Sequence, residues 1–300
     1  MVFIGRQTKE QIIKDYGAHV SSGKVDFYEL VGLDLVIGHR EGPWIWDTSV
    51  DAPRGTGNRL MNCHCNGGVY NLGHRHPEIV KTLIAATNKD GGLDIGNHHL
   101  ISEQRARLAK KLVELTPDEI TRVVFGVGGG EAVDFGIKLA RAHTGKHKII
   151  YAEGAYHGHT GLALAAGAKQ FKAPFEPLAP GFVAVPFGDS PAIETAIDDE
   201  TAAVLLETIP ATLGMPLPRQ DYYPKIREIC DKKGSLLILD EIQTGLGRTG
   251  KLWAFEHFGI VPDIFCIAKG LSGGVYPISA TLYREELDSF CRKNPFIHVS

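Results

Sequence analysis

The chain has 300 residues, close to the limit of about 250–300 residues for a single hydrophobic core, so one large core or two domains are expected. Its 43% hydrophobic and 22% charged residues are ordinary for a globular protein and exclude intrinsic disorder and collagen-like repeats. The net charge of −3 leaves no excess of basic residues for nucleic acid or an anionic membrane surface, so we expect neither as a partner.

Five cysteines are an odd number in a long chain and do not suggest a disulfide framework. Free thiols favour a reducing compartment, and we therefore predict a cytoplasmic location. The first residues lack the basic start and apolar run of a signal peptide. No stretch approaches the roughly 18 apolar residues of a membrane-spanning helix.

Residues 1–60 have a mixed pattern, in which LDLVIG (33–38) alternates and GPWIWD (43–48) is rich in Trp. We expect this segment to form a smaller unit packed beside the main sheet. Two helices are predicted after it, at residues 77–91 and 102–115, because apolar residues recur there at helical spacing. Ser102 is a plausible N-cap for the second of these helices.

From Arg122 onward, short apolar runs alternate with helical patterns. Continuous Val, Ile and Leu runs are typical of strands that are buried on both faces of a sheet covered by helices. Helices are predicted at 131–146 and 222–234, each ending near a glycine. The runs are RVVF (122–125), KIIYA (148–152), FVAVPF (182–187), AAVLLE (202–207), SLLILD (235–240), IFCIAK (264–269) and ISATLY (278–283). The pattern predicts an α/β fold with a mostly parallel sheet.

Glycine is in excess, at 35 residues, and three glycines stand together in GVGGGEA (126–132), between a strand and a helix. Such a segment lets backbone N–H groups and a helix N-terminus bind a phosphate. A dinucleotide-binding fingerprint fits poorly, because Glu131 stands where its last small residue belongs, although Glu153 at the next strand end keeps a nicotinamide-dependent oxidoreductase open as a remote alternative. GLGRTGKL (245–252) resembles a kinase-type phosphate loop, but Leu252 replaces the hydroxyl that Mg²⁺ needs.

Asp240 ends one predicted strand and Lys269 ends a later one. Ligands of open α/β sheets bind at the carboxyl ends of strands, so Gly129, Asp240 and Lys269 are expected to meet in one crevice. Desolvation there would lower the pKa of Lys269 and make it a nucleophilic amine. An anion site, a carboxylate for a pyridinium nitrogen and an imine-forming amine are together what pyridoxal phosphate requires.

These residues also carry a resemblance to a family. The segment LLILDEIQTGLGRTGKLWAFEHFGIVPDIFCIAKGLSGGVYPISA, with NLGHRHPEIV (71–80), EAVDFGIKLAR (131–141) and YAEGAYHGHTGLALAAGA (151–168), resembles the class III pyridoxal-phosphate-dependent aminotransferases in the same order. The resemblance runs from about Asn71 to Ser300. It implies the fold type I architecture, with a seven-stranded mixed sheet flanked by helices, and a homodimer with its sites at the subunit interface.

The resemblance also implies a function and a division into domains. Residues 1–60 would belong to a small domain and residues 61–300 would form the large domain that binds pyridoxal phosphate. The enzyme would move an amino group from an amine or amino acid to a keto acid in two half-reactions. Lys269 would form the internal aldimine and then shuttle the proton, while Asp240 would keep the pyridinium nitrogen protonated. An aminomutase or racemase of the same family stays open as an alternative.

Further cofactor contacts are implied by position. They are Gly129 and Gly130 at the phosphate, Ile242 and Tyr156 on the two ring faces, His157 beside Tyr156, Gln243 at the ring hydroxyl, and Glu207. The chain departs from the family pattern at Gly128–Gly130, where a hydroxyl side chain is usual, and in ETIPATLGMPLP (207–218), which leaves the substrate open. The chain also stops where the family continues into a C-terminal small domain, so we expect the natural protein to extend beyond Ser300.

A metal site is not expected. Cys63, His64 and Cys65 lie near His74 and His76, and these residue types bind zinc. The C-x-C spacing, however, is shorter than the usual spacing of two to four residues between zinc-binding cysteines. His74 and His76 already belong to the segment that resembles the aminotransferases.

Overall fold

The computed structural model describes residues 7–33, 35–48, 58–88 and 100–293. Its core is a seven-stranded sheet with the strand order β4-β10-β9-β8-β7-β5-β6. The strands are β4 (Ile120–Gly126), β5 (Lys148–Ala152), β6 (Phe182–Val185), β7 (Thr201–Glu207), β8 (Leu236–Asp240), β9 (Ile264–Ile267) and β10 (Ser279–Arg284). Each of the seven predicted apolar runs forms one of these strands, so the predicted α/β fold is confirmed.

Strand direction decides which loops reach which edge of the sheet. β6, β5, β7, β8 and β9 are mutually parallel, whereas β10 runs antiparallel to both β9 and β4. The register pairs Ser279, the first residue of β10, with Gly126, the last residue of β4. The chain therefore enters β10 at the same edge where the parallel strands end.

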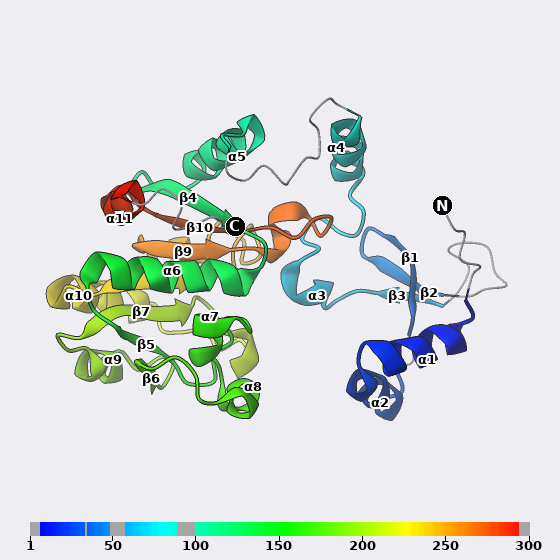
Figure 1. Cartoon of the computed structure of the whole chain (residues 1–300), viewed down its shortest axis with the longest axis horizontal. Coiled ribbons are helices and arrows are strands. Elements are labelled where there is room, and N and C mark those ends of the chain that lie inside the picture. The colour runs from blue at the N-terminus through cyan, green and yellow to red at the C-terminus, as the bar shows by residue number, and fades with distance from the viewer. Residues whose placement is uncertain (1–6, 34, 49–57, 89–99, 294–300) are drawn as a thin grey trace.

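Every residue of β7 is buried, as expected for a strand in a sheet that helices cover on both faces. α6 (Gly129–Thr144) packs on one face of the sheet, roughly along the strands, and contacts β4, β7, β8, β9 and β10 (Figure 1). α10 (Tyr222–Lys233) packs beside β8. Both helices end as predicted at a glycine in the left-handed conformation, Gly145 and Gly234, which have no Cβ to be strained there.

Shorter elements complete this part of the chain. Ser102 caps α5 as predicted, because its hydroxyl accepts the N–H of Arg105 at 3.5 Å. The helices are α5 (Glu103–Glu114), α7 (Gly161–Ala165), α8 (Lys169–Lys172), α9 (Ser190–Ala196) and α11 (Ser289–Lys293). The 3-10 turns are η1 (Ala173–Phe175), η2 (Ala211–Leu213), η3 (Ala254–Phe258), η4 (Lys269–Ser272) and η5 (Glu285–Asp288). None of the helices in the described segments is long and apolar enough to cross a membrane.

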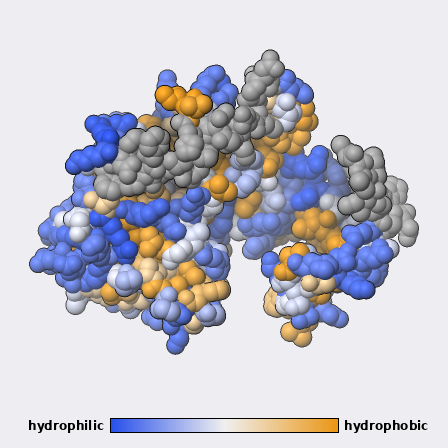
Figure 2. Space-filling model, viewed as in Figure 1, coloured by the Kyte–Doolittle hydropathy of each residue, from blue (hydrophilic) through white to orange (hydrophobic). Residues whose placement is uncertain are grey.

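The N-terminal residues form a second, smaller lobe beside the main sheet (Figure 1). Its antiparallel sheet has the order β1-β2-β3, and β3 spans the expected boundary at residue 60. Hydrophobic atoms lie on the surface of this lobe (Figure 2). Its elements and the two helices that follow are α1 (Lys9–His19), α2 (Ser22–Leu30), β1 (Ile37–Glu41), β2 (Trp44–Asp47), β3 (Arg59–Met61), α3 (Cys65–Gly68) and α4 (Pro77–Thr87).

Two predictions for this region differ in their bounds from the structure. The alternating segment 33–38 contributes only its last two residues to β1, and Leu33 directly follows the turn at Val31 and Gly32. The helix predicted at 77–91 is α4, which ends at Thr87. The last residues of that prediction, and the question of an extension beyond Ser300, lie outside the described residues.

Candidate active site

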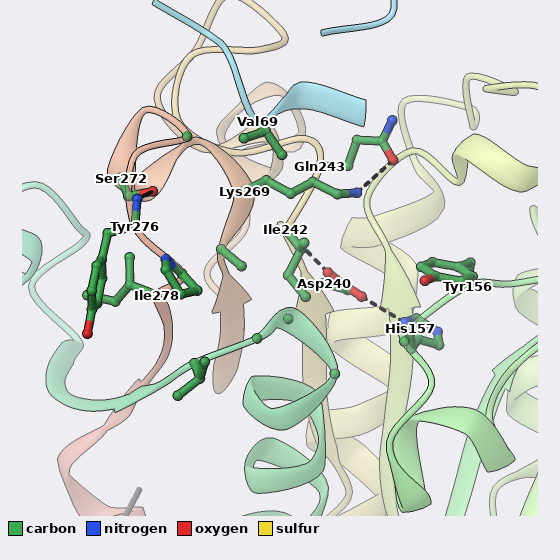
Figure 3. A pocket seen from close by; sticks show the side chains of 18 of the residues that line it. Val69, Tyr156, His157, Asp240, Ile242, Gln243, Lys269, Ser272, Tyr276 and Ile278 are labelled. Carbon is green, nitrogen blue, oxygen red and sulfur yellow. Dashed lines mark hydrogen bonds and ion pairs between the residues drawn. The ribbon is translucent and has the colours of Figure 1, made fainter. Parts of the chain in front are cut away.

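A pocket of about 430 Å³ opens where the parallel strands end and where the chain enters β10. Its volume lies in the usual range for small-molecule sites, which is about 300–1,000 Å³. The structure brings all nine predicted site residues into this pocket, and Figure 3 shows several of them facing one another. They are Gly129, Gly130, Tyr156, His157, Glu207, Asp240, Ile242, Gln243 and Lys269.

The glycine segment forms the N-terminus of α6, with Gly128 as the N-cap. A glycine offers no side chain to the first N–H groups of the helix, so these donors remain available to an anion. The backbone is also closely packed. A Cβ on Gly129 would lie 2.9 Å from Ile242 Cδ1, and a Cβ on Gly130 would lie 2.7 Å from Thr160 Oγ1. The segment therefore fits a phosphate held by backbone donors.

Asp240 and His157 form a buried pair. His157 Nδ1 lies 2.9 Å from Asp240 Oδ2, and the N–H of Ile242 donates to Asp240 Oδ1 at 3.0 Å (Figure 3). Burial lowers the pKa of His157, but the hydrogen bond and charge of Asp240 outweigh it, so the net direction is upward. The pair thus places a carboxylate at the end of β8, with one oxygen beside His157 and the other held by a backbone N–H.

Lys269 follows β9 and extends its amine into the pocket. Its Nζ donates to Gln243 Oε1 at 3.2 Å (Figure 3). Burial lowers the pKa of Lys269, while the charges of Asp240 and Glu207 act in the opposite direction. The lowered pKa leaves a larger share of neutral amine at physiological pH, as a nucleophilic lysine requires.

Tyr156 and Ile242 supply flat and apolar walls. The N–H of Tyr156 donates to Glu207 Oε1 at 2.9 Å, and burial raises the pKa of this carboxyl. The ring of Tyr156 packs edge-on against Phe171, at 5.3 Å between centroids. Glu207 thus fixes the backbone of Tyr156, a contact that could not be predicted from the residue types alone.

Glu241 was missed by the sequence reasoning, although it follows Asp240 directly. Each oxygen of its buried carboxylate accepts one hydroxyl and one backbone N–H. Oε1 accepts Thr208 Oγ1 at 2.5 Å and Phe255 N at 3.1 Å, and Oε2 accepts Thr244 Oγ1 at 3.1 Å and Ala254 N at 2.9 Å. Burial raises its pKa to about 7 against these four bonds. Glu241 therefore fixes the end of β8 to β7 and η3.

The other missed residues form the wall opposite His157. Ser272 and the segment 274–278 line the pocket, together with Val69 and Val127. Ser272, Tyr276 and Ile278 lie on the side away from His157 (Figure 3). The glycines in GLSGGVYP mark a turn, but they do not show which way the next strand runs. The antiparallel direction of β10 returns this turn to the pocket.

The motifs that suggested a kinase-type phosphate loop, a nicotinamide site or a metal site do not form those sites in the structure. GLGRTGKL (245–252) forms turns in which Arg248 donates to Asn71, not a loop before a helix. Glu153 is exposed and does not line the pocket. Within the described segments, no group of three or more His, Cys, Asp or Glu side chains is placed to hold a metal ion.

Comparisons with known proteins agree with this geometry. Residues 32–294 match the family described as Aminotransferase class-III. A curated relative named an uncharacterized aminotransferase, from Archaeoglobus fulgidus, is 65% identical over 300 residues, which cover 100% of this chain and 68% of the relative. The chain belongs to the class III aminotransferases. The predicted family and its reaction class, the transfer of amino groups, are thereby confirmed, and the aminomutase, racemase and oxidoreductase alternatives are not favoured.

Two further similarities are informative. A putrescine aminotransferase from Pectobacterium atrosepticum is 41% identical over 254 residues, covering 81% of this chain and 54% of that protein. The solved structure of taurine:2-oxoglutarate aminotransferase from Bifidobacterium kashiwanohense, in complex with PLP and glutamate, has a TM-score of 0.81 and 26% identity. This match covers 97% of the chain and 68% of the solved one. The chain spans about two thirds of the length of the Archaeoglobus relative and about half of the length of the Pectobacterium relative.

Proposed function

We propose that this chain binds pyridoxal phosphate and forms the catalytic part of an aminotransferase that moves an amino group from an amine or amino acid to a keto acid. The observation that supports this most strongly is the meeting of three groups in one pocket. These are the half-buried amine of Lys269, the Asp240–His157 pair and the N-terminus of α6, where Gly129 and Gly130 carry no side chains.

Each part of the proposed cofactor fits residues on the pocket wall. Gly129 and Gly130 would hold the phosphate through backbone N–H groups, since any side chain there meets Ile242 or Thr160. Asp240 would hold the ring nitrogen, and Gln243 would approach the ring hydroxyl. When bound, pyridoxal phosphate supplies an electron sink for the bond that is broken at the substrate carbon.

The chain's own groups would hold and move the proton. Lys269 Nζ would take the proton from the substrate carbon and return it, because its desolvated amine has a lowered pKa. Glu207 would hold Tyr156 in place through the backbone N–H, and Tyr156 with Ile242 would exclude water from the ring faces. His157 would hold the Asp240 carboxylate in place through their hydrogen bond.

Replacement of Lys269 tests this proposal. We expect Lys269→Ala to lose both turnover and the visible absorbance that borohydride removes from the parent protein. Lys251→Ala is the control, because Lys251 is exposed and lies outside the pocket. Turnover should also require a keto acid such as pyruvate or 2-oxoglutarate. A Lys269→Ala protein that kept its colour and turnover would contradict the proposal.

We further propose that the protein is a homodimer with the pocket near its interface. Support comes from an apolar groove along α4 that includes Leu72, Ile79 and Leu83. Val275 lines both this groove and the pocket, and Leu72 and Ile84 leave 57% of their surfaces exposed. Exposed apolar residues that gather beside a site favour a protein partner. Light scattering should give twice the mass of the chain, and the mass of a monomer would contradict this proposal.

Two assignments complete the proposal. Residues 1–60 are assigned to a small domain and residues 61–300 to the large cofactor-binding domain, which is supported by the separate sheet β1-β2-β3. A cytoplasmic location is supported by the five free cysteines, which suit a reducing compartment. Cell fractionation tests the location, and limited proteolysis near residue 60 tests the boundary.

A further inference from the structure

The turn that carries Lys269 has an unusual backbone. Lys269 has φ +39°, in the left-handed region that residues other than Gly and Asn rarely adopt. Such a conformation is strained and persists only where its surroundings hold it. The turn therefore needs a contact outside β9 that opposes relaxation.

Asn71 makes such a contact. A Cβ on Gly270, the residue after Lys269, would lie 2.7 Å from Asn71 Nδ2 and 3.2 Å from Asn71 Cγ. The side chain of Asn71 therefore packs directly on the backbone of the turn, and only a glycine leaves room for it. Gly67, in the same segment, lies close to the amine, since its Cβ would lie 3.6 Å from Lys269 Nζ.

The side chain of Asn71 is itself fixed. Its Nδ2 donates to the carbonyl of Leu246 at 3.1 Å, and its Oδ1 accepts from the guanidinium of Arg248. Leu246 also has a positive φ, +57°. Three segments far apart in the sequence, at residues 71, 246–248 and 269–270, thus meet at one amide.

We propose that Asn71 is a positioning residue for Lys269, whose side chain holds the Lys269–Gly270 turn in the left-handed conformation that directs Nζ into the pocket. This inference rests on the proposed role of Lys269 as the imine-forming amine. Asn71 does not line the pocket. It acts through the backbone of Gly270 and through the loop after β8.

The consequence concerns the state of the amine. Nζ faces Gln243 and the carboxylates of Asp240 and Glu207, and its burial lowers its pKa. Without Asn71 the turn relaxes and admits water, so the pKa of Lys269 rises toward its ordinary value. Because only the neutral amine attacks an aldehyde, imine formation near neutral pH then becomes slower.

The test measures this step without turnover. Protein from which the cofactor has been removed is mixed with pyridoxal phosphate. The rate at which the borohydride-reducible complex forms is then measured at a series of pH values. We expect Asn71→Ala to shift the midpoint of this profile upward, so that the reaction is slower than in the parent near neutral pH but equally fast well above the midpoint. Asn62→Ala is the matched control, because Asn62 also binds two neighbours, Cys65 N at 2.9 Å and His74 Nε2 at 2.8 Å. It should lower thermal stability without moving the profile.

A second pair of variants tests the contact itself. Gly270→Ala introduces the Cβ that meets Asn71 and should also slow imine formation, whereas the double variant with Asn71→Ala gives this Cβ room and should be faster than Gly270→Ala alone. If Asn71→Ala does not fold, an unchanged profile in Gly270→Ala overturns the inference. An unchanged profile in a folded Asn71→Ala does the same. A parent protein that forms no reducible complex would instead contradict the proposed function.

Discussion

The carboxylate of Glu241 allows a quantitative prediction. In Glu241→Gln one oxygen becomes an NH₂ group, and each oxygen of the parent accepts a backbone N–H, from Phe255 or from Ala254. Whichever way the amide is turned, its NH₂ faces a buried N–H donor. Since a buried donor without a partner costs about 1–3 kcal/mol, the variant should be less stable than the parent by that amount at alkaline pH.

The difference should also depend on pH. Burial raises the pKa of Glu241 to about 7 from 4.5, so the folded state binds the proton more tightly than the unfolded state. The stability from this proton is fully present below the unfolded pKa of 4.5 and is lost as pH rises through about 7. Glutamine binds no proton, so its deficit should be larger near about pH 5 than near about pH 8, by about 2–3 kcal/mol.

Urea unfolding of the stripped proteins at several pH values measures this difference, and other titrating groups cancel because both proteins share them. Glu256→Gln is the control, because Glu256 accepts one backbone N–H, from Trp253 at 2.9 Å, beside the same turn. A deficit that is equal at acidic and alkaline pH would refute the proton linkage. A variant more stable than its parent at alkaline pH would refute the argument from the four donors.

Three other substitutions have definite expected outcomes. Gly129→Ala places a Cβ 2.9 Å from Ile242 Cδ1 and should weaken pyridoxal phosphate binding about tenfold, as measured by equilibrium dialysis. In the control Gly128→Ala, the new Cβ meets nothing within 4 Å, and binding should not weaken. Equal losses of affinity in the two variants would contradict the packing argument. Tyr156→Phe keeps the wall and should retain most turnover, whereas Tyr156→Ala should not, and steady-state kinetics that rank them equally would remove the wall role. Asp263→Asn weakens the part-buried ion pair with Arg227, at 2.7 Å, and should cost about 3 kcal/mol in urea unfolding; a loss under about 1 kcal/mol would show that the pair contributes little.

The sheet could be predicted from the sequence because its signal is local and redundant. Seven short apolar runs, most of them soon followed by Gly, Pro or Asp, are hard to arrange except as buried strands. The meeting of Asp240 and Lys269 followed from the rule that parallel strands end at one edge of the sheet. In the N-terminal lobe the signal is weaker, because every residue of WIWD in β2 is only half-buried, so no clear alternation is imposed.

The other features of the site could be recognised only in the folded structure. An apolar run does not tell its direction, so the return of residues 274–278 to the pocket was not predictable before β10 was seen to be antiparallel. Glu241 looked like one more charged residue after a strand, and only its four partners show that it is buried. Asn71 and Gly270 lie almost two hundred positions apart, and no periodicity connects them.

The single reversed strand divides the pocket wall by origin. One part is made by chain that leaves the sheet, at Asp240 and Lys269, and cannot change length without moving the reacting groups. The other part, 272–278, is made by chain that returns to the sheet and ends in the pairing of Ser279 with Gly126. Substitutions or insertions in that returning segment change the space beside the amine while the groups that would hold the cofactor keep their places. Variation in this segment can therefore change which amino-group donor fits the pocket while Lys269 and Asp240 stay unchanged.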